Sequence, residues 1–533
     1  MNNKSILPLK FIFFCLLLNF SCNVSGEKKA TQKLKSENAL SGKELSEKHC
    51  QSCHLYPDPS ELDKKTWERS VLPLMGRLFG IYEAEVPRSK ILEGAINKKA
   101  VEELHMFPEK PSIATVDWEK IKAYYLAEAP ETLDQTIWDE NKITHLEGFK
   151  MVEPEENGKL QNITFLKTDP THKGIFVSGA SGERGSLAIL NSDNRISQMI
   201  PLPSAPTDVA FGKDELSITL AGSLRLSPGK NKFGDLITLF RNPGELQYSA
   251  FRKFLSQLNR PVQTVFEDIN GNGLRDILVA EFGYYTGALT LFENKDNTEQ
   301  PYKKTTLKNV AGAIHTIVKD MNGNGKKDII ALFAQGDEGI SIFYNEGEGQ
   351  FTEERVLRFP PTYGSVSFDL VDFNQDGYLD ILYGNGDNGD YPPIAKPYHG
   401  LRIFENDGKN NFKQVYFFPM NGVNKCAAAD FDQDGQLEIV AVDYFPDFDL
   451  PGRQDFVYLK QEAPYAYQPQ VLKTKLDARW ITFEIGDIDK DGDLDLLLGS
   501  NGSYYNKLNL TEETKDMKGP LLILENQVKI NKD

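Results

Sequence analysis

From about residue 140 onward, short apolar runs alternate with polar turns, at lengths typical of β-strands rather than of helices. Five of these runs directly follow a short acidic segment, and the clearest such segment reads DIDKDGDLD from Asp487. The first aspartates of the five segments lie at positions 268, 320, 372, 430 and 487, in steps of 52, 52, 58 and 57 residues. A repeat of this length that contains about four strands predicts the blades of a β-propeller.

A second repeated feature counts the blades independently of the acidic segments. It is an apolar strand that ends in Asn or a similar polar residue, and it ends at Asn191, Asn242, Asn294, Asn345, Asn406, Lys460 and Asn526. These seven strands predict seven blades, which we place in residues 140–533, with the first two blades lacking an acidic segment. Few residues follow Asn526, so we expect the stretch from Leu146 to Glu153 to supply an outer strand of the last blade and close the ring.

The acidic segments share one arrangement of side chains, with oxygen atoms at positions 1, 3, 5 and 9 and Gly at position 6. Calcium binds hard oxygen ligands that converge on one ion, and Gly lets the backbone turn sharply around it. An EF-hand has a helix after its loop, whereas these segments run into apolar strands, so that interpretation is excluded. The alternative to a calcium loop is an Asp/Asn turn held by its own side-chain hydrogen bonds.

Residues 41–135 show a helical pattern instead. Capping signals predict three helices: one opened by a capping box of Ser41 and Glu44, one from Leu62 to Leu78 capped by Ser60 with Asp63, and one from Thr115 that stops before Pro130. The first helix leads into the motif CQSCH, which runs from Cys50 through Cys53 to His54.

The order C-x-x-C-H is the attachment signature of c-type heme. Two thiols at this spacing reach both vinyl groups along one heme edge, and the adjacent imidazole then lies under the iron. A thioredoxin-like dithiol would need a strand–helix–strand context, which the sequence around Cys50 lacks. We therefore predict one covalent heme c, bound through Cys50, Cys53 and His54.

The sixth iron ligand is predicted to be a methionine. Three helices around a heme resemble a small class I cytochrome c, and the stretch TWERSVLPLMGRLFG resembles a segment of cytochrome domains fused to repeat proteins. That resemblance favours Met75, which follows the W…LP pattern. Met106, in a Met-Phe-Pro setting before the last helix, is the second candidate, and His49 and His105 remain as further alternatives.

The N-terminus carries an export signal. An apolar run over residues 11–20 follows two lysines and is too short to span a bilayer, as in a signal peptide. The run stops at Ser21-Cys22, which resembles a bacterial lipobox. We expect a signal peptide over residues 1–21, lipidation of Cys22 and a flexible tether over residues 22–40, with plain secretion as the alternative.

The length and the net charge of the chain bear on its domain organisation and on its partners. A chain of 533 residues is too long for one core, and a formal net charge of −17 argues against nucleic acid as a partner. Much of the acidity lies in the five acidic segments, where bound cations would neutralise part of it. Cys426, the cysteine outside the N-terminal part, is expected to be a small buried residue rather than a nucleophile.

Two family resemblances follow from these motifs. Residues 160–530 look like the FG-GAP/VCBS repeats of integrin-type propellers, and residues 41–130 look like a cytochrome c domain. Together they resemble the cytochrome-containing VCBS-repeat lipoproteins of Bacteroidetes-type bacteria. The resemblance implies a multidomain chain in which a small all-α class I cytochrome c domain (residues 41–135) precedes an all-β seven-bladed propeller.

In the integrin-like family such loops hold calcium, and the resemblance implies up to five structural calcium ions. The implied ligands are Asp268, Asn270, Asn272 and Asp276; Asp320, Asn322, Asn324 and Asp328; Asp372, Asn374, Asp376 and Asp380; Asp430, Asp432, Asp434 and Glu438; and Asp487, Asp489, Asp491 and Asp495. A backbone carbonyl at position 7 would complete each site. The fourth loop departs from the pattern because it ends in Glu438 rather than Asp.

A polar residue also recurs five positions before each acidic segment, as Gln263, His315, Ser367, Lys425 and Thr482. Alternation along a strand places this set on one face and at one height around the ring. We consider two interpretations, a ligand site at the mouth of the central channel and a solvated start of each inner strand.

The leading functional hypothesis is an extracytoplasmic electron-transfer lipoprotein, periplasmic or on the cell surface and anchored to the outer membrane of a Gram-negative bacterium. Its propeller would dock a redox partner protein or a substrate. The first alternative is a heme-linked dehydrogenase of a sugar or alcohol, although no GxGxxG fingerprint on a strand–helix turn is present. The second alternative is a calcium-dependent adhesion or glycan-binding surface protein with a carbohydrate ligand.

Overall fold

The structure is a computed structural model that describes residues 39–134, 138–169, 174–224, 231–242, 244–245, 247–296, 301–389, 394–446, 455–472, 478–502 and 519–528. The chain divides into Met1–Lys35 and Ser36–Asp533. The expected signal peptide, the lipidation site Cys22 and nearly all of the expected tether lie outside the described residues. Within the part that is described, no helix is long and apolar enough to cross a bilayer.

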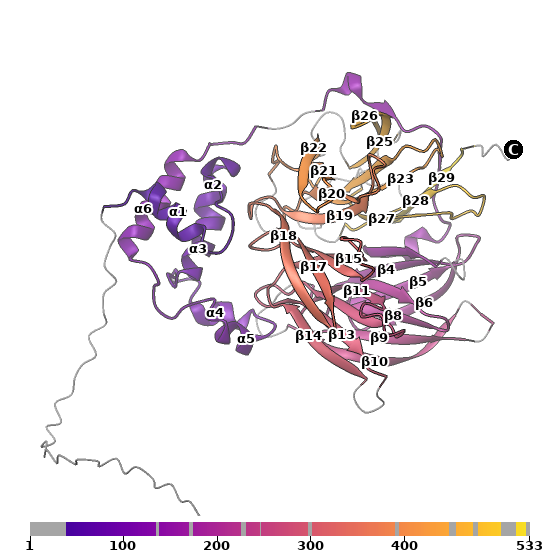
Figure 1. Cartoon of the computed structure of the whole chain (residues 1–533), viewed down its shortest axis with the longest axis horizontal. Helices are drawn as coiled ribbons and strands as arrows, with labels where there is room; N and C mark the ends of the chain where they lie inside the picture. Colours follow the sequence, from indigo (N-terminus) through magenta and orange to yellow (C-terminus); the bar gives the residue numbers. More distant parts are fainter. Residues whose placement is uncertain are drawn as a thin grey trace, which may run out of the picture. The chain divides into compact units, whose positions relative to one another are not determined.

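The described N-terminal part is helical (Figure 1). Its elements are α1 (Gly42–Cys50), the 3-10 turn η1 (Pro59–Glu61), α2 (Lys64–Thr66), the π-helical turn η2 (Trp67–Val71), α3 (Leu72–Leu78), α4 (Arg88–Glu93), α5 (Lys98–Glu103) and α6 (Thr115–Glu128). The first and third predicted helices are confirmed as α1 and α6. The predicted capping box opens α1, because Ser41 Oγ accepts from the Glu44 backbone N and Glu44 Oε2 accepts from the Ser41 backbone N.

The second predicted helix exists but begins two residues later than predicted. Asp63 is its N-cap, with extended backbone angles and Oδ1 accepting from the Thr66 backbone N at 2.9 Å. Ser60 belongs to η1 and does not cap this helix. The helix runs through α2, η2 and α3, and the wider π-helical turn accommodates Pro73, whose ring would otherwise collide with the preceding turn.

The helices α4 and α5 were not predicted. Each has six residues, too few for a periodic apolar pattern to stand out. Their buried residues Ile91, Leu92 and Val101 pack with Phe107 in a small hydrophobic cluster of their own.

The described remainder of the chain forms seven β-sheets, six with four strands and one with five, so the seven-bladed all-β propeller is confirmed. Blades 1 to 4 contain β3 (Ile163–Thr168), β4 (Ile175–Ser181), β5 (Arg184–Leu190) and β6 (Ile196–Leu202); β7 (Pro206–Phe211), β8 (Glu215–Leu220), β9 (Gly234–Arg241) and β10 (Tyr248–Leu258); β11 (Pro261–Glu267), β12 (Asp276–Glu281), β13 (Ala288–Asn294) and β14 (Tyr302–Lys308); and β15 (Ala313–Lys319), β16 (Asp328–Phe333), β17 (Gly339–Gly347) and β18 (Gln350–Arg358).

Blades 5 to 7 follow the same antiparallel order and include two strands from before blade 1. They contain β19 (Ser365–Val371), β20 (Asp380–Asn385), β21 (Gly400–Asn406) and β22 (Phe412–Pro419); β23 (Val423–Ala429), β24 (Glu438–Asp443), β25 (Phe456–Ala463), β26 (Ala466–Val471) and β1 (Thr144–His145); and β27 (Trp480–Gly486), β28 (Asp495–Ser500), β29 (Leu521–Asn526) and β2 (Phe149–Val152). The third strand of five blades ends at or beside its predicted marker residue, and β17 and β25 run on past Asn345 and Lys460 to Gly347 and Ala463.

The ring closes as predicted, with an N-terminal strand completing the last blade. Strand β2 pairs antiparallel with β29, with Met151 opposite Leu524. One feature was not predicted: β1 adds a fifth, parallel strand to blade 6, with Thr144 opposite Gln470. A two-residue strand carries no periodic signal of its own.

The first strands of successive blades contact one another in a closed series around the ring. The recurring polar position on these strands joins neighbouring blades rather than standing free in solvent. Its side chains make the following contacts to the next blade: Asp208 Oδ2 accepts from Thr264 N at 3.0 Å, Gln263 Oε1 from Thr316 N at 2.6 Å, Ser367 Oγ from Cys426 N at 3.0 Å, Lys425 Nζ donates to the Phe483 carbonyl at 2.5 Å, and the His315 ring packs on Phe368 at 4.9 Å. Of the five predicted residues, Gln263, Ser367 and Lys425 bond to backbone groups of the next blade and His315 packs on it, so at these four the position is structural. The fifth, Thr482, donates from Oγ1 to the Phe483 carbonyl of its own strand at 3.5 Å.

Within Ser36–Asp533, side chains of the helical part contact connections of the propeller. Glu61 Oε2 accepts from Thr362 Oγ1 at 2.5 Å, and Tyr398 OH donates to the Glu61 carbonyl at 2.9 Å. The rings of Phe107 and Tyr285 lie 5.0 Å apart. Tyr285 and Tyr398 lie in connections between the second and third strands of their blades, and Thr362 lies in the connection between two blades. In an antiparallel blade these connections are at the opposite end of the sheet from the acidic loops, which join first and second strands.

Candidate functional sites

The C-x-x-C-H motif lies at the end of α1, where Cys50 is the last helical residue and His54 lies in the turn that follows. His54 Nδ1 lies 2.7 Å from the Leu55 carbonyl oxygen. A carbonyl oxygen can only accept, so Nδ1 carries the proton and Nε2 keeps its lone pair. Burial lowers the pKa of His54, which also favours the neutral ring. This is the form in which imidazole ligates a metal through Nε2.

Both cysteines of the motif are free thiols. Cys50 is half-buried and Cys53 is exposed, and the two are not joined as a disulfide. Burial raises the pKa of the Cys50 thiol to about 11, and Tyr125 lies beside it. A raised pKa keeps the Cys50 thiol protonated at neutral pH, unlike the lowered pKa of a redox-active C-x-x-C pair.

The two candidate methionines pack in different places. Met75, in α3, packs against the hydrophobic cluster that includes Leu45 of α1 and Trp118 of α6. Met106 packs against the separate α4–α5 cluster. Of the two, Met75 is thus the one that shares a core with the helix that carries the motif. His105 is exposed, and His49 makes an edge contact with Phe79 at 6.2 Å.

The five acidic loops are pinned by their last residue. The carboxylate at position 9 is fully buried in each loop, in Asp276, Asp328, Asp380, Glu438 and Asp495. In blade 4, Asp328 Oδ2 accepts from the Met321 backbone N at 2.9 Å, and Oδ1 accepts from the Asn345 backbone N at 2.8 Å. This carboxylate therefore ties the loop to the marker residue at the end of the third strand.

In the first four loops the carboxylate at position 1 also turns inward, onto backbone N–H groups of its own loop. Asp268 Oδ1 accepts from the Gly271 backbone N at 2.8 Å, and Oδ2 accepts from the Gly273 backbone N at 2.8 Å. The Gly at position 6 has a positive φ in all five loops, from 80° at Gly325 to 102° at Gly492, as the sharp turn requires. The loops are thus folded by their own hydrogen bonds, and an ion would bind to a preformed turn.

In two loops three carboxylates come close together. Oxygens of Asp430, Asp432 and Glu438 lie within 4.8 Å of one another, as do oxygens of Asp487, Asp489 and Asp495. The longer Glu438 therefore still reaches its loop. Its Oε1 is buried without a hydrogen-bond partner among the described residues, and burial raises its pKa to about 7. Such like charges fit a site for a hard cation such as calcium.

The structure adds the buried carboxylate of Asp493, a residue for which we predicted only a backbone carbonyl ligand. It occupies position 7 of the fifth loop, is 1% exposed, and neither oxygen has a hydrogen-bond partner in the part of the chain that is described. Burial raises the pKa of Asp493, helped by Asp491 and Asp495. The sequence did single out this residue. Position 7 is acidic in the fifth loop and is not acidic in the other four loops.

Comparison with known proteins supports the repeats. Residues 268–331 and 320–383 match the family described as FG-GAP-like repeat. Cartilage acidic protein 1 of Mus musculus is 30% identical over 112 residues, which cover 20% of this chain and 16% of that protein. Its Xenopus tropicalis counterpart is 26% identical over 199 residues, which cover 35% and 29%. The chain thus spans less than a third of the length of these relatives.

Two solved structures show a distant likeness. A chain in the structure of S. cerevisiae Dbp5 bound to Nup159, Gle1, IP6 and ADP has a TM-score of 0.40 and 12% identity, covering 74% of this chain and 98% of that one. A protein from Lactobacillus plantarum has a TM-score of 0.38 and 13% identity, covering 59% and 86%. At these scores neither defines the fold, which follows from the sheet topology. Residues 268–383 therefore carry FG-GAP-like repeats, set within a seven-bladed β-propeller.

Proposed function

We propose that this protein is an extracytoplasmic heme c electron-transfer lipoprotein whose calcium-binding propeller docks a redox partner or a substrate-bearing protein. The observation that carries the proposal is the C-x-x-C-H motif, with two thiols that form no disulfide and with His54 Nδ1 bonded to the Leu55 carbonyl. That bond leaves Nε2 as the free ligand atom.

The residues around the motif have defined tasks in this proposal. Cys50 and Cys53 would hold the heme covalently, and the Leu55 carbonyl orients His54. Met75 is the preferred sixth ligand and Met106 the second choice. When bound, heme c supplies reversible one-electron oxidation and reduction at its iron. The buried side chains of Trp67 and Trp118 exclude water from the core next to α1.

The propeller residues would act as a rigid support. Oxygens at positions 1, 3, 5 and 9 of each acidic loop would hold calcium, and Asp493 would add a ligand in the fifth loop. The ion would have no catalytic part, because the position-9 carboxylates are buried and bonded to backbone N–H groups. A lipid anchor on Cys22 would keep the molecule at a membrane, in the periplasm or at the cell surface.

The test is a visible spectrum of the exported protein, produced in a host with active heme-ligation machinery. We expect a covalent heme c spectrum in the wild type and a colourless Cys50→Ser/Cys53→Ser variant. Met75→Ala should lose the methionine-to-iron charge-transfer band, and Met106→Ala should keep it. A colourless wild type, made where a control cytochrome matures normally, would overturn the proposal.

The alternatives give different results in the same preparation. A heme-linked dehydrogenase would show heme reduction when a sugar or alcohol is added without another reductant. A calcium-dependent adhesion or glycan-binding protein would keep calcium-dependent binding in the Cys50→Ser/Cys53→Ser variant. The propeller and its acidic loops are compatible with both.

A further inference from the structure

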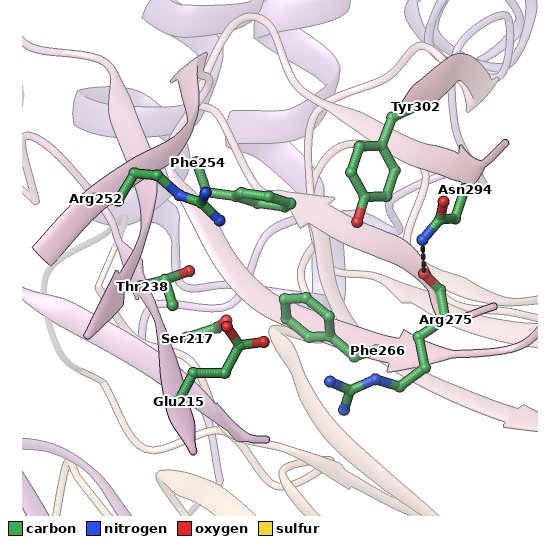
Figure 2. Close-up of a pocket in the computed structure, with 9 residues that line it drawn as sticks. All are labelled: Glu215, Ser217, Thr238, Arg252, Phe254, Phe266, Arg275, Asn294 and Tyr302. Atoms are coloured by element: carbon green, nitrogen blue, oxygen red, sulfur yellow. Dashed lines mark hydrogen bonds between the residues drawn. The ribbon is translucent and has the colours of Figure 1, made fainter. Parts of the chain in front are cut away.

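A cleft of about 290 Å³ opens between blades 2 and 3 (Figure 2). Blade 2 contributes Ser217 of β8, Thr238 of β9 and Arg252 of β10. These three residues pair in one cross-strand row, with Thr238 opposite both of the others. Blade 3 contributes Phe266 and Tyr302, among others, and Figure 2 shows the Tyr302 hydroxyl directed into the space.

The cleft lies where a link between blades is missing. In blade 4 the marker Asn345 donates from Nδ2 to the Ile269 carbonyl in the acidic loop of blade 3, at 2.9 Å. Asn526 makes the same bond to Phe431 in the acidic loop of blade 6, also at 2.9 Å. Blade 2 has only a tight turn in place of this loop, so Asn294 of blade 3 has no such acceptor. Its Nδ2 instead lies 3.4 Å from the carbonyl of Arg275 in its own blade.

Among the described residues, the charged side chains of the cleft have no ionic partners. Arg252 stacks over Phe254 and Arg275 over Phe266, each at 5.7 Å from the ring centre. Neither guanidinium pairs with a carboxylate of the described chain, and Glu215 likewise forms no ion pair there. The cleft thus carries an excess of one positive charge in a chain whose net charge is −17. It is therefore suited to an anion, against the overall charge of the protein.

We propose that this cleft binds a carboxylated sugar ring, either a free acidic monosaccharide or the end of an acidic glycan chain. Each property of the ligand has a counterpart in the site. An arginine guanidinium matches a carboxylate through two parallel hydrogen bonds. The hydroxyls of Ser217, Thr238 and Tyr302 match ring hydroxyls, and the flat faces of the phenylalanines match the apolar face of a pyranose.

Size and surroundings agree with this assignment. The volume is at the small end of ligand pockets and suits about one sugar unit. Phe240 of β9 is 39% exposed and lies under the Arg252 guanidinium, 5.9 Å from its ring centre. Phe240 pairs with Glu215 of the cleft across the strands, so a longer chain has an aromatic surface to continue on.

The test is isothermal titration of the full exported protein, in calcium, with glucuronate as the probe. We expect saturable binding by the wild type and roughly tenfold weaker binding by Arg252→Gln and by Arg275→Gln, because each variant loses one charge-assisted contact. Arg184→Gln, an exposed arginine of blade 1, is the matched control and should bind as the wild type does. Thermal unfolding of each variant separates loss of binding from loss of fold.

Two further probes define the ligand class. Glucose lacks the carboxylate and should bind at least about tenfold more weakly than glucuronate. Glucose 6-phosphate places a phosphate on the same ring, and tighter binding of this ester than of glucuronate would replace the proposal with a phosphate site. Absence of glucuronate binding, equal binding of glucose, or unchanged binding in both arginine variants would overturn it. None of these measurements depends on the heme.

Discussion

At the scale of single residues, one buried carboxyl group shows how a structural position can make the stability of the fold depend on pH. Glu338, 3% exposed, lies at the connection between β16 and β17 and accepts from the Ser365 backbone N at 2.8 Å. Burial raises the pKa of this carboxyl to about 7. Its role is structural, and it makes the stability of the propeller depend on pH.

Replacing Glu338 by Gln should remove that pH dependence. The pKa of Glu338 is higher in the folded protein than in the unfolded chain, so its contribution to stability is complete below about pH 4.5 and is lost as the pH rises through about 7. The unfolding free energy of Glu338→Gln relative to wild type should therefore rise by roughly 3 kcal/mol between these pH values. Urea unfolding at a series of pH values measures the difference. Exposed Glu354→Gln is the control, and parallel curves for Glu338→Gln and wild type would contradict the expectation.

At the scale of elements, the marker residue and the acidic loop form one unit that also connects blades. Asn345 Nδ2 donates to Ile269 in the previous blade and to Lys327 in its own, at 2.9 and 3.0 Å. Asn345 and Asn526 therefore have a tertiary role, because each bonds to the acidic loop of the previous blade. Each supplies donors to carbonyls that strand pairing leaves free.

Replacing Asn345 by Ala should leave two carbonyls without their donor. We expect Asn345→Ala to lower the unfolding free energy by about 2 kcal/mol. Asn294→Ala should cost less than about 1 kcal/mol, because Asn294 Nδ2 has only the 3.4 Å contact within its own blade. Denaturant unfolding of the two variants side by side gives the comparison. Equal losses would show that the bond between blades is not what stabilises the unit.

The acidic loops should differ in calcium affinity. The fifth loop has five carboxylates, whereas the loops from Asp268 and Asp320 each have two among their predicted ligands. Because calcium affinity increases with ligand charge, the fifth loop should bind most tightly, and Asp489→Asn should weaken that site on the order of tenfold. Isothermal titration of calcium into chelator-treated protein resolves the tightest class of sites, and exposed Asp193→Asn is the control. A tightest class that survives Asp489→Asn would exclude the fifth loop as its location.

At the scale of the whole molecule, the propeller depends on a strand from before its first blade. Strand β2 completes blade 7, and β1 extends blade 6, so residues 144–152 join the start of the propeller to its end. Closing the ring this way leaves β29 paired on both sides.

Two truncated chains test this closure. A chain of residues 138–533 keeps β1 and β2, and a chain of residues 154–533 lacks both. We expect cooperative unfolding of the longer chain and a loss of several kcal/mol in the shorter one, because β29 then has an unpaired edge. Limited proteolysis should cleave the shorter chain first near its C-terminus. Identical protease resistance in the two chains would show that β2 is dispensable.

The sequence by itself determined the features that depend on local chemistry and on repetition. The capping box at Ser41 and Glu44, the helix from Thr115, the strand markers and the count of blades all follow from spacing, because each blade repeats one pattern of apolar strands and turns. The C-x-x-C-H motif and the acidic loops are local for the same reason. The short elements α4, α5 and β1 were not predicted, because each is too short to show a periodic pattern of apolar residues.

Only the tertiary structure decided how distant residues combine. It showed Gln263 and Ser367 bonding to the next blade, Asp493 buried inside the fifth loop, and the cleft beside Arg252 and Arg275. The bonds of Gln263 and Ser367 and the cleft are not visible in the spacing, because each depends on the approach of two blades whose strands are separated by dozens of residues. Periodicity places a side chain on a face of its own strand, but its partner across the interface is fixed by how the sheets pack.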